Sequence, residues 1–488
     1  MKRTLSFILA VGTTLCSFAQ QILTLDSCRV LALKNNKELR ISQEKINAAH
    51  YEKKAAFTNF LPKIGVTGGY IRTQKEISLL SDEQKQTISN LGTTTGSQLQ
   101  QSLQTLAAQN PGLAAGLQGV LPGAISGLTT GLNSIGQGIV DALRTDTRNL
   151  TVGAATLTQP IFMGGKIIAY NKITKYAERL AESQHATGMQ NIILDTDQAY
   201  WLVVSLANKK KLADSFLKLV TKLDSDVSKM VKEGVATKAD MLSVKVKVNE
   251  AEMTSVQVGN GLSLAKMALC QLCGLPLDTD IKLADEEINS LTLPNAYTEA
   301  NVSTALANRQ ELKSLEFASD IYRQKVNVVR SDFLPSVALT ANYIVTNPSL
   351  INGFENRFRG MWAAGVVVNI PIFHWGEGIY KVKAAKAEAN IARYKLEDTR
   401  EKVELQVTQS AYKVNEAAKK LAMAEKSMER AEENLRYANL GFKEGVIPTS
   451  NVLEAQTAWL SAQSAKIDAQ IDVKLSELYL NKSMGILK

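Results

Sequence analysis

Two long stretches of the chain place apolar residues at the spacing of a packed helix. In the clearer one, apolar positions alternate in steps of four and three, as the seam of a coiled coil requires. These positions are Leu212, Phe216, Leu219, Leu223, Val227 and Met230. They lie in a proline-free segment from about 166 to 232, and a similar segment runs from about 378 to 443. At 1.5 Å per residue each would span on the order of 100 Å, which predicts two long helices packed against other helices.

Four shorter stretches alternate apolar with small or polar residues, which is the period of a β-strand. The clearest follows Pro335, and its apolar face is formed by Val337, Leu339, Ala341, Tyr343 and Val345. The four predicted strands cover about 63–73, 149–159, 336–346 and 361–371. Alternation over about ten positions, with aromatic residues near the ends, is typical of strands in outer-membrane proteins.

The chain repeats itself. The stretch KEGVATKADML, which begins at Lys232, recurs as KEGVIPTSNVL at Lys443, and the same offset carries residues 160–162 onto 371–373. The chain is therefore interpreted as a tandem duplication. In each copy of the motif a glycine ends one predicted helix and the next helix begins within a few residues. This predicts two helical hairpins with tips at about 232–242 and 443–453.

The duplication defines the predicted domains. Residues 1–19 have the basic start, apolar run and small residues of a secretory signal peptide, so the mature protein is expected outside the cytoplasm. Residues 20–274 form the first repeat, 275–304 a linker, and 305–488 the second repeat. The first repeat carries an inserted segment at about 76–144, between its two strands. This segment is expected at the extracellular end of the strands.

Composition argues against several classes of protein. The net charge of +9 is spread along the chain, which favours a solvated surface over nucleic-acid binding. His50, His185 and His374 are the only histidines and lie far apart, and neither Gly-x-Ser-x-Gly nor a Walker lysine loop occurs. The sequence therefore predicts no enzyme, no cofactor and no metal site. Cys270 and Cys273 are interpreted as packing residues rather than a redox or metal pair.

The predicted strands constrain the assembly. Four strands cannot close, and an open sheet edge in lipid leaves backbone groups unsatisfied at several kcal/mol each. The chain is therefore expected to oligomerise. Two chains would supply eight strands and three would supply twelve, and only the larger barrel leaves an interior wide enough for more than water and ions.

The stretches Gln159–Gly165 and Ala431–Gln456 make the chain similar to the TolC family of outer-membrane efflux ducts. The resemblance implies a mainly α fold with a membrane β-barrel. In it, long antiparallel coiled-coil hairpins form a periplasmic tunnel, and four strands per chain contribute to a shared twelve-stranded barrel in a homotrimer. It also implies that the tips meet a periplasmic adaptor (membrane fusion protein) of an inner-membrane transporter, and that substrates leave through the outer membrane.

The resemblance further implies site residues. The expected adaptor-docking residues of the tips are Gly234, Val235, Thr237, Gly445, Val446 and Pro448. Acidic side chains after the second tip narrow the tunnel entrance in this family, and the matching positions here are Asn451 and Glu454, with Asp240 assigned to the same constriction. Threefold symmetry would place Glu454 in a ring of three carboxylates that favours cations. The alternative is that Glu454 is an ordinary exposed helix residue.

The inserted segment keeps the apolar spacing of helices, from Leu99 to Ile139. Gly119, Gly123, Gly127 and Gly131 recur at every fourth residue, which permits close approach of another helix or sheet. Pro111 and Pro122 are expected to divide the segment into short helices. The hypothesis is a partly helical cap over the exit, and the alternative is a flexible loop.

A periplasmic coiled-coil scaffold without a conducting pore is the alternative function. Long helices alone would serve it, but it leaves the apolar strand faces unexplained. For a duct, the sequence leaves open which pump and adaptor it serves. It also leaves open whether drugs, metal ions, bile salts or secreted peptides pass through.

Overall fold

A computed structural model describes residues 21–74, 80–109, 121–143, 148–286, 301–349 and 355–487. The chain forms two compact units. One contains residues 1–54, 170–326 and 381–488, and the other contains residues 55–169 and 327–380. The predicted signal peptide, residues 287–300 of the predicted linker, and the positions of Pro111 and Gly119 lie outside the described residues.

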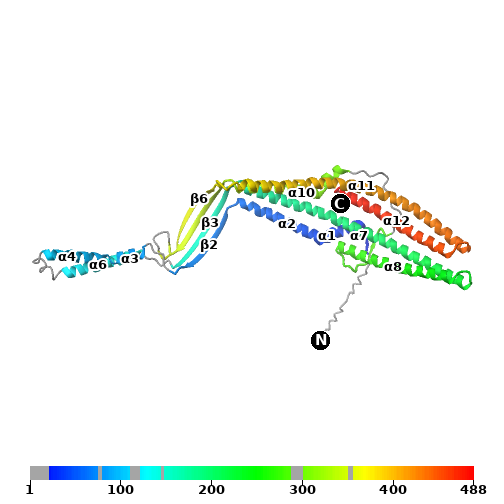
Figure 1. Cartoon of the computed structure of the whole chain (residues 1–488), viewed down its shortest axis with the longest axis horizontal. Coiled ribbons are helices and arrows are strands. Elements are labelled where there is room, and N and C mark those ends of the chain that lie inside the picture. The colour runs from blue at the N-terminus through cyan, green and yellow to red at the C-terminus, as the bar shows by residue number, and fades with distance from the viewer. Residues whose placement is uncertain are drawn as a thin grey trace, which may run out of the picture. The chain divides into compact units, whose positions relative to one another are not determined.

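The first unit is built from two helical hairpins, and the predicted long helices are confirmed (Figure 1). Helix α7 (Lys166–Lys232) turns back into α8 (Lys238–Cys273), and α11 (Glu377–Lys443) turns back into α12 (Thr449–Ser483). Both α7 and α11 contain 67 residues. Across the described ranges, no helix combines the length and apolar character that a membrane crossing needs.

The apolar stripes of these helices form the core of each hairpin. Phe216 and Val220 of α7 pack with Ala251 of α8, and Leu460 of α12 packs against the same cluster. In the second hairpin, Leu421 of α11 is buried in a cluster with small side chains of α12. The exposed faces carry apolar residues among the polar ones, among them Met253 of α8 and Leu405 of α11.

A small layer joins the beginning of the chain to its middle. Strand β1 (Gln21–Leu23) pairs in parallel with β4 (Ile281–Leu283). Helix α1 (Leu25–Asn35) follows β1, and α9 (Val302–Asn308) is its counterpart in the second half. Helices α2 (Lys37–Phe57) and α10 (Gln310–Ser331) continue from them toward the strands.

The core beneath this layer holds polar groups that are all paired. Leu23 and Ile281 are buried beside Tyr200, whose hydroxyl donates to Asp285 Oδ2 at 2.6 Å. Arg29 Nε donates to Asp197 Oδ1 at 2.8 Å, and the Asp197 side chain is fully buried. This ion pair joins α1 to α7, because a buried carboxylate needs a partner of opposite charge.

Three free cysteines lie in the same core. Cys28 of α1 and Cys270 and Cys273 of α8 are all fully buried. The Cys273 Sγ lies 3.7 Å from the Cys28 carbonyl oxygen. Contact with the Cys273 thiol and then burial raise the pKa of the Cys28 thiol, and burial raises that of Cys270. A raised pKa keeps a thiol protonated, and a protonated thiol is a poor nucleophile.

The second unit contains the sheet, and the predicted four antiparallel strands are confirmed. They are β2 (Lys63–Arg72), β3 (Asn149–Met163), β5 (Ser336–Asn347) and β6 (Arg359–Asn369), in the order β2-β3-β5-β6. The β3–β5 register shifts between Pro160 and Phe162, since proline has no N–H to donate to the ladder. Within the described residues, β2 and β6 each have a strand partner on one side only.

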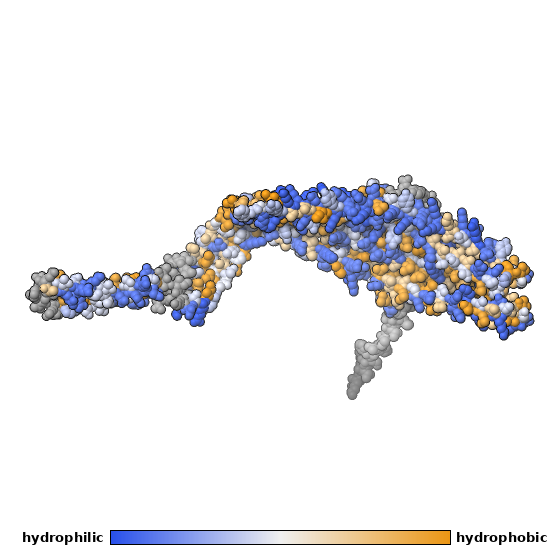
Figure 2. All heavy atoms as spheres, viewed as in Figure 1, coloured by the Kyte–Doolittle hydropathy of each residue, from blue (hydrophilic) through white to orange (hydrophobic). Residues whose placement is uncertain are grey.

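One face of this sheet is apolar and exposed. The register places Ile64, Leu157, Ala341 and Ala364 in one row across the four strands, and the next row contains the Tyr343–Trp362 pair. Residues in register share a face. Ile64 is 74% and Trp362 75% exposed, and hydrophobic residues are visible along the strands in Figure 2. The opposite face carries Thr67, Thr156, Thr340 and Asn342 together with apolar residues such as Ile344 and Val367.

Between β2 and β3, the described residues of the second unit include helices α3 (Asp82–Ser89), α4 (Leu91–Gln109) and α6 (Leu121–Ala142). Helices α4 and α6 pack closely at Gly92, which has no side chain. A β-carbon at this position would collide with the Thr129 carbonyl oxygen. The Asn133 side chain accepts from the Gly92 N–H at 2.8 Å. Pro122 lies in the first turn of α6, where a missing N–H costs no helical hydrogen bond.

The buried cysteines generate a prediction. In the folded protein, Cys28, Cys270 and Cys273 should resist a thiol-alkylating reagent, because they are inaccessible and the Cys28 and Cys270 thiols stay protonated. Intact-mass measurement should show three alkyl groups only after denaturation. A Gln101→Cys variant, with its thiol on the exposed side of α4, is the positive control and should gain one group without denaturant. Rapid labelling of any native cysteine in the folded protein would contradict the buried cluster.

Candidate functional site

The first hairpin tip is a turn that requires glycine. Gly234 follows the end of α7 with φ of 76°, a left-handed conformation that costs other residues energy. The Val235 N–H donates to the Met230 carbonyl oxygen at 2.8 Å, and the Gly234 N–H donates to the Val231 carbonyl oxygen at 3.2 Å. These two bonds form a Schellman motif, which satisfies the last carbonyls of the helix.

The second tip has the same geometry. Gly445 has φ of 74°. The Val446 N–H donates to the Gly441 carbonyl oxygen at 2.8 Å, and the Gly445 N–H donates to the Phe442 carbonyl oxygen at 3.1 Å. The repeated Lys-Glu-Gly-Val sequence thus encodes one turn twice, once for each long helix.

The tips differ in how the next helix begins. Thr237 Oγ1 accepts from the Asp240 N–H at 3.1 Å, and Asp240 Oδ2 accepts from the Thr237 N–H at the same distance. This is a capping box, and its hydrogen bonds, first from the Thr237 side chain, lower the pKa of Asp240. In the second repeat Pro448 stands at the cap without a side-chain hydrogen bond. Asn451 occupies the position that corresponds to Asp240.

The role of Asp240 at this cap was absent from the sequence prediction, which assigned Asp240 to the entrance constriction. A threonine followed by an acidic residue three positions later is a signal for helix capping, and Thr237–Asp240 carries it. In the chain, Asp240 thus stabilises the start of α8.

A shared core lies beneath the two tips. Val244 of α8 and Val452 of α12 are fully buried in one cluster with Leu223 and Val227 of α7. Ile447, in the second turn, packs against the same cluster. The two tips therefore lie side by side within the first unit (Figure 1).

The predicted docking residues are exposed above this core. Val235 is 71% and Val446 79% exposed, so each turn presents one apolar side chain to its surroundings. Asn451 and Glu454 lie three residues apart on the exposed side of α12, whereas Val452 and Ala455 face the core. The structure thus brings Asn451 and Glu454 to one helix face, and Asp240 lies in the other tip.

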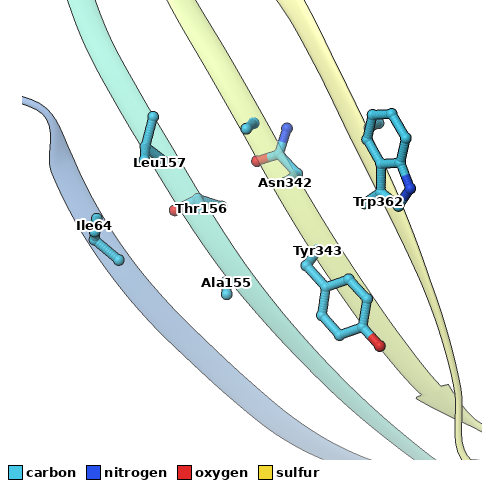
Figure 3. A pocket seen from close by; sticks show the side chains of 9 residues that line it. Ile64, Ala155, Thr156, Leu157, Asn342, Tyr343 and Trp362 are labelled. Atoms are coloured by element: carbon cyan, nitrogen blue, oxygen red, sulfur yellow. The ribbon is translucent and has the colours of Figure 1, made fainter.

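The apolar sheet face forms a second candidate surface. A shallow groove of about 240 Å³ runs across it, and its side chains include Ile64, Leu157, Tyr343 and Trp362 (Figure 3). Gly360 leaves room for the Tyr343 ring, because a β-carbon there would lie 2.2 Å from the Tyr343 hydroxyl oxygen. A groove with this lining suits hydrocarbon rather than a polar ligand.

Where β6 leads into α11, apolar side chains gather on the surface. Ile372 is 91% and Trp375 88% exposed, and the rings of Phe373 and Trp375 lie 5.0 Å apart. Among the described residues, Trp375 is the one non-glycine with positive φ, at 48°. Its counterpart in the first repeat is Gly164, where a β-carbon would lie 2.7 Å from the Ser331 carbonyl oxygen. The second repeat thus holds a strained tryptophan where the first has room only for glycine.

Comparison with known proteins places this chain in a family. Residues 29–275 and 301–486 match the family model described as outer membrane efflux protein. The chain is 24% identical over 248 residues to the alkaline protease secretion protein AprF of Pseudomonas aeruginosa, and the aligned region covers 51% of each chain. It is 20% identical over 354 residues to the outer membrane protein TolC of Escherichia coli, and this aligned region covers 70% of each chain. The match thus spans about half the length of AprF and a larger share of TolC.

Solved structures share the fold over nearly the whole chain. The outer membrane protein VceC of Vibrio cholerae superposes with a TM-score of 0.70 at 16% identity, covering 94% of this chain and 96% of VceC. The open state of the MtrE outer membrane channel of Neisseria gonorrhoeae gives a TM-score of 0.68 at 16% identity, covering 95% and 89%. With its family match, paired hairpins and four-stranded sheet, the chain belongs to the outer membrane efflux protein family.

Proposed function

We propose that this chain is one subunit of a trimeric channel in the outer membrane. The channel receives substrates from a periplasmic adaptor and an inner-membrane transporter and releases them outside the cell. The observation that carries the proposal is the four-stranded sheet, which has two open edges and an exposed apolar face in a member of the outer membrane efflux protein family.

The open edges support the trimer. Strands β2 and β6 lie at opposite ends of the sheet order and run in opposite directions. If β2 of each copy pairs with β6 of the next, the new ladders are antiparallel like the rest. Three copies then close a barrel of twelve strands, which satisfies every edge in lipid and leaves a wide interior.

The apolar surfaces support the placement in a membrane. In the closed barrel, the row containing Tyr343 and Trp362 faces lipid, and the groove beside them accommodates acyl chains. The face with Thr156 and Asn342 lines the interior, which matches the alternation of membrane barrels. Phe373 and Trp375 then lie where the barrel ends, and aromatic side chains favour the interface of a membrane with water.

The tips support docking of an adaptor. Val235 and Val446 are exposed apolar side chains held on rigid turns above a buried core, and exposed apolar groups of this kind suit a protein partner. The relatives' names include an alkaline protease secretion protein and toluene efflux pump components. The transporter, rather than the duct, is therefore proposed to select the substrate.

The constriction is proposed at the start of α12. Around a threefold axis, the exposed Glu454 side chains would form a ring of three carboxylates, with Asn451 on the same helix face. Such a ring raises the local concentration of cations. Asp240 contributes to this region through the stability of the neighbouring tip, since its carboxylate is engaged in the capping box.

The assembly predicts the mass of the purified protein. After detergent extraction, native mass spectrometry should give three chains per particle, because only the trimer satisfies the strand edges. A folded monomer would contradict the proposed function.

The tip geometry predicts a specific defect. Gly445→Val should distort the turn at a local cost of about 1 kcal/mol or more, because valine disfavours positive φ. Export of a reporter substrate should fall while the trimer still assembles. Gly445→Asn is the matched control and should retain export, since asparagine tolerates this conformation. Unimpaired export by the valine variant would show that the partner docks elsewhere.

The carboxylate ring predicts ion selectivity. Glu454→Gln removes one charge per copy from the narrow entrance and should weaken the preference for cations in planar-bilayer recordings. Glu429→Gln removes an exposed charge from α11 and is the control. Equal selectivity in the wild type and the Glu454 variant would place Glu454 outside the constriction.

A further inference from the structure

The inserted hairpin, formed by α4 and α6, exposes apolar side chains on the outer side of α6. Gly136 and Val140 of α6 are buried, and a β-carbon on Gly136 would collide with the Ile88 carbonyl oxygen at the end of α3. On the other side of the helix, Leu128, Ile135 and Ile139 are 46%, 59% and 43% exposed. Exposed apolar side chains that cluster on one side of a helix suit packing against a further element.

The outer side of α6 has the spacing of a helix-packing seam. Its positions follow each other in alternating steps of four and three, which is the heptad pattern. We call them the outer seam: Ala124, Leu128, Gly131, Ile135, Gly138 and Ala142, all exposed. A β-carbon on Gly131 or Gly138 would have no neighbour within 4 Å. Large and small residues thus alternate, which lets a second helix of the same kind approach closely.

The inserted hairpin contains a single charged residue among its described positions, Asp141 near the end of α6. Between Lys85 and Asp141 the sequence contains no charged residue, although 21% of the whole chain is charged. A partner that binds through charge would find no complementary group there. The seam therefore matches another apolar helix with little charge, and a second copy of α6 has both properties.

The connections of the inserted hairpin bring such copies together. It leaves the sheet after Arg72 of β2 and returns at Asn149 of β3, and these two residues are paired. Strand β2 is an edge strand, so in the trimer it meets β6 of the next copy. We infer that the outer seams of three copies pack against one another and form a helical cap that narrows the extracellular exit. This inference rests on the proposed trimeric channel.

Cross-linking tests the contact directly. Gly131→Cys introduces a thiol at the centre of the outer seam, and the native cysteines are buried. With copper phenanthroline as oxidant, two neighbouring thiols should form a disulfide and give a covalent dimer on denaturing gels. Gln101→Cys, on the exposed side of α4, is the matched control and should give little dimer. A native trimer in which both variants cross-link equally would overturn the cap and leave the proposed channel standing.

Conductance tests the consequence. Ile135→Glu places three like charges in the packed seam and should raise single-channel conductance several-fold, while Gln101→Glu should leave it unchanged. Replacing residues 74–146 with a short turn should raise conductance at least as much as Ile135→Glu. Native mass spectrometry of each variant checks that the trimer persists. Unchanged conductance in a trimer that lacks the segment would overturn the cap, and a monomeric wild type would overturn both proposals.

Discussion

The unpaired backbone groups along β2 and β6 are the constraint on which the rest of the molecule depends. A sheet of four strands has too few strands to curl into a closed surface, and its apolar face leaves it exposed to aggregation in water. In the proposed trimer, closure with other copies inside a membrane solves both problems. The strands of that ring would also hold the long hairpins of the three copies around one axis.

The two predicted repeats share a plan but differ at their tips and at their strand-to-helix junctions. Both tips use the same left-handed glycine turn, yet Thr237 and Asp240 cap α8 with reciprocal hydrogen bonds, while Pro448 starts α12 without any. At the strand-to-helix junctions, Gly164 is enclosed and Trp375 is exposed. The two hairpins therefore share their turn geometry. The tips differ in how the following helix is capped, and the strand-to-helix junctions differ in the residue at positions 164 and 375.

Much of the fold could be predicted from the sequence because its elements are long and strongly periodic. The seam from Leu212 to Met230 repeats often enough to identify a helix. The β1–β4 pair was missed because three residues carry too little periodicity. The Arg29–Asp197 ion pair and the common core of the tips were missed because contacts between distant segments leave no local pattern. The roles proposed for Glu454 and Val446 involve other chains, whose positions are absent from a single sequence.

The order of the strands also bears on how the protein reaches its final state. Strand β3 from the first half pairs with β5 from the second, so the sheet forms only after most of the chain has been delivered. If the protein assembles as proposed, each chain exposes two sheet edges and an apolar face until it meets other copies, which makes the monomer the species most prone to aggregation. Such assembly would depend on concentration, and a holding chaperone that captured the monomer would compete with it. On the proposed function, the passage of the monomer to the membrane is the stage at which this protein is most exposed to loss.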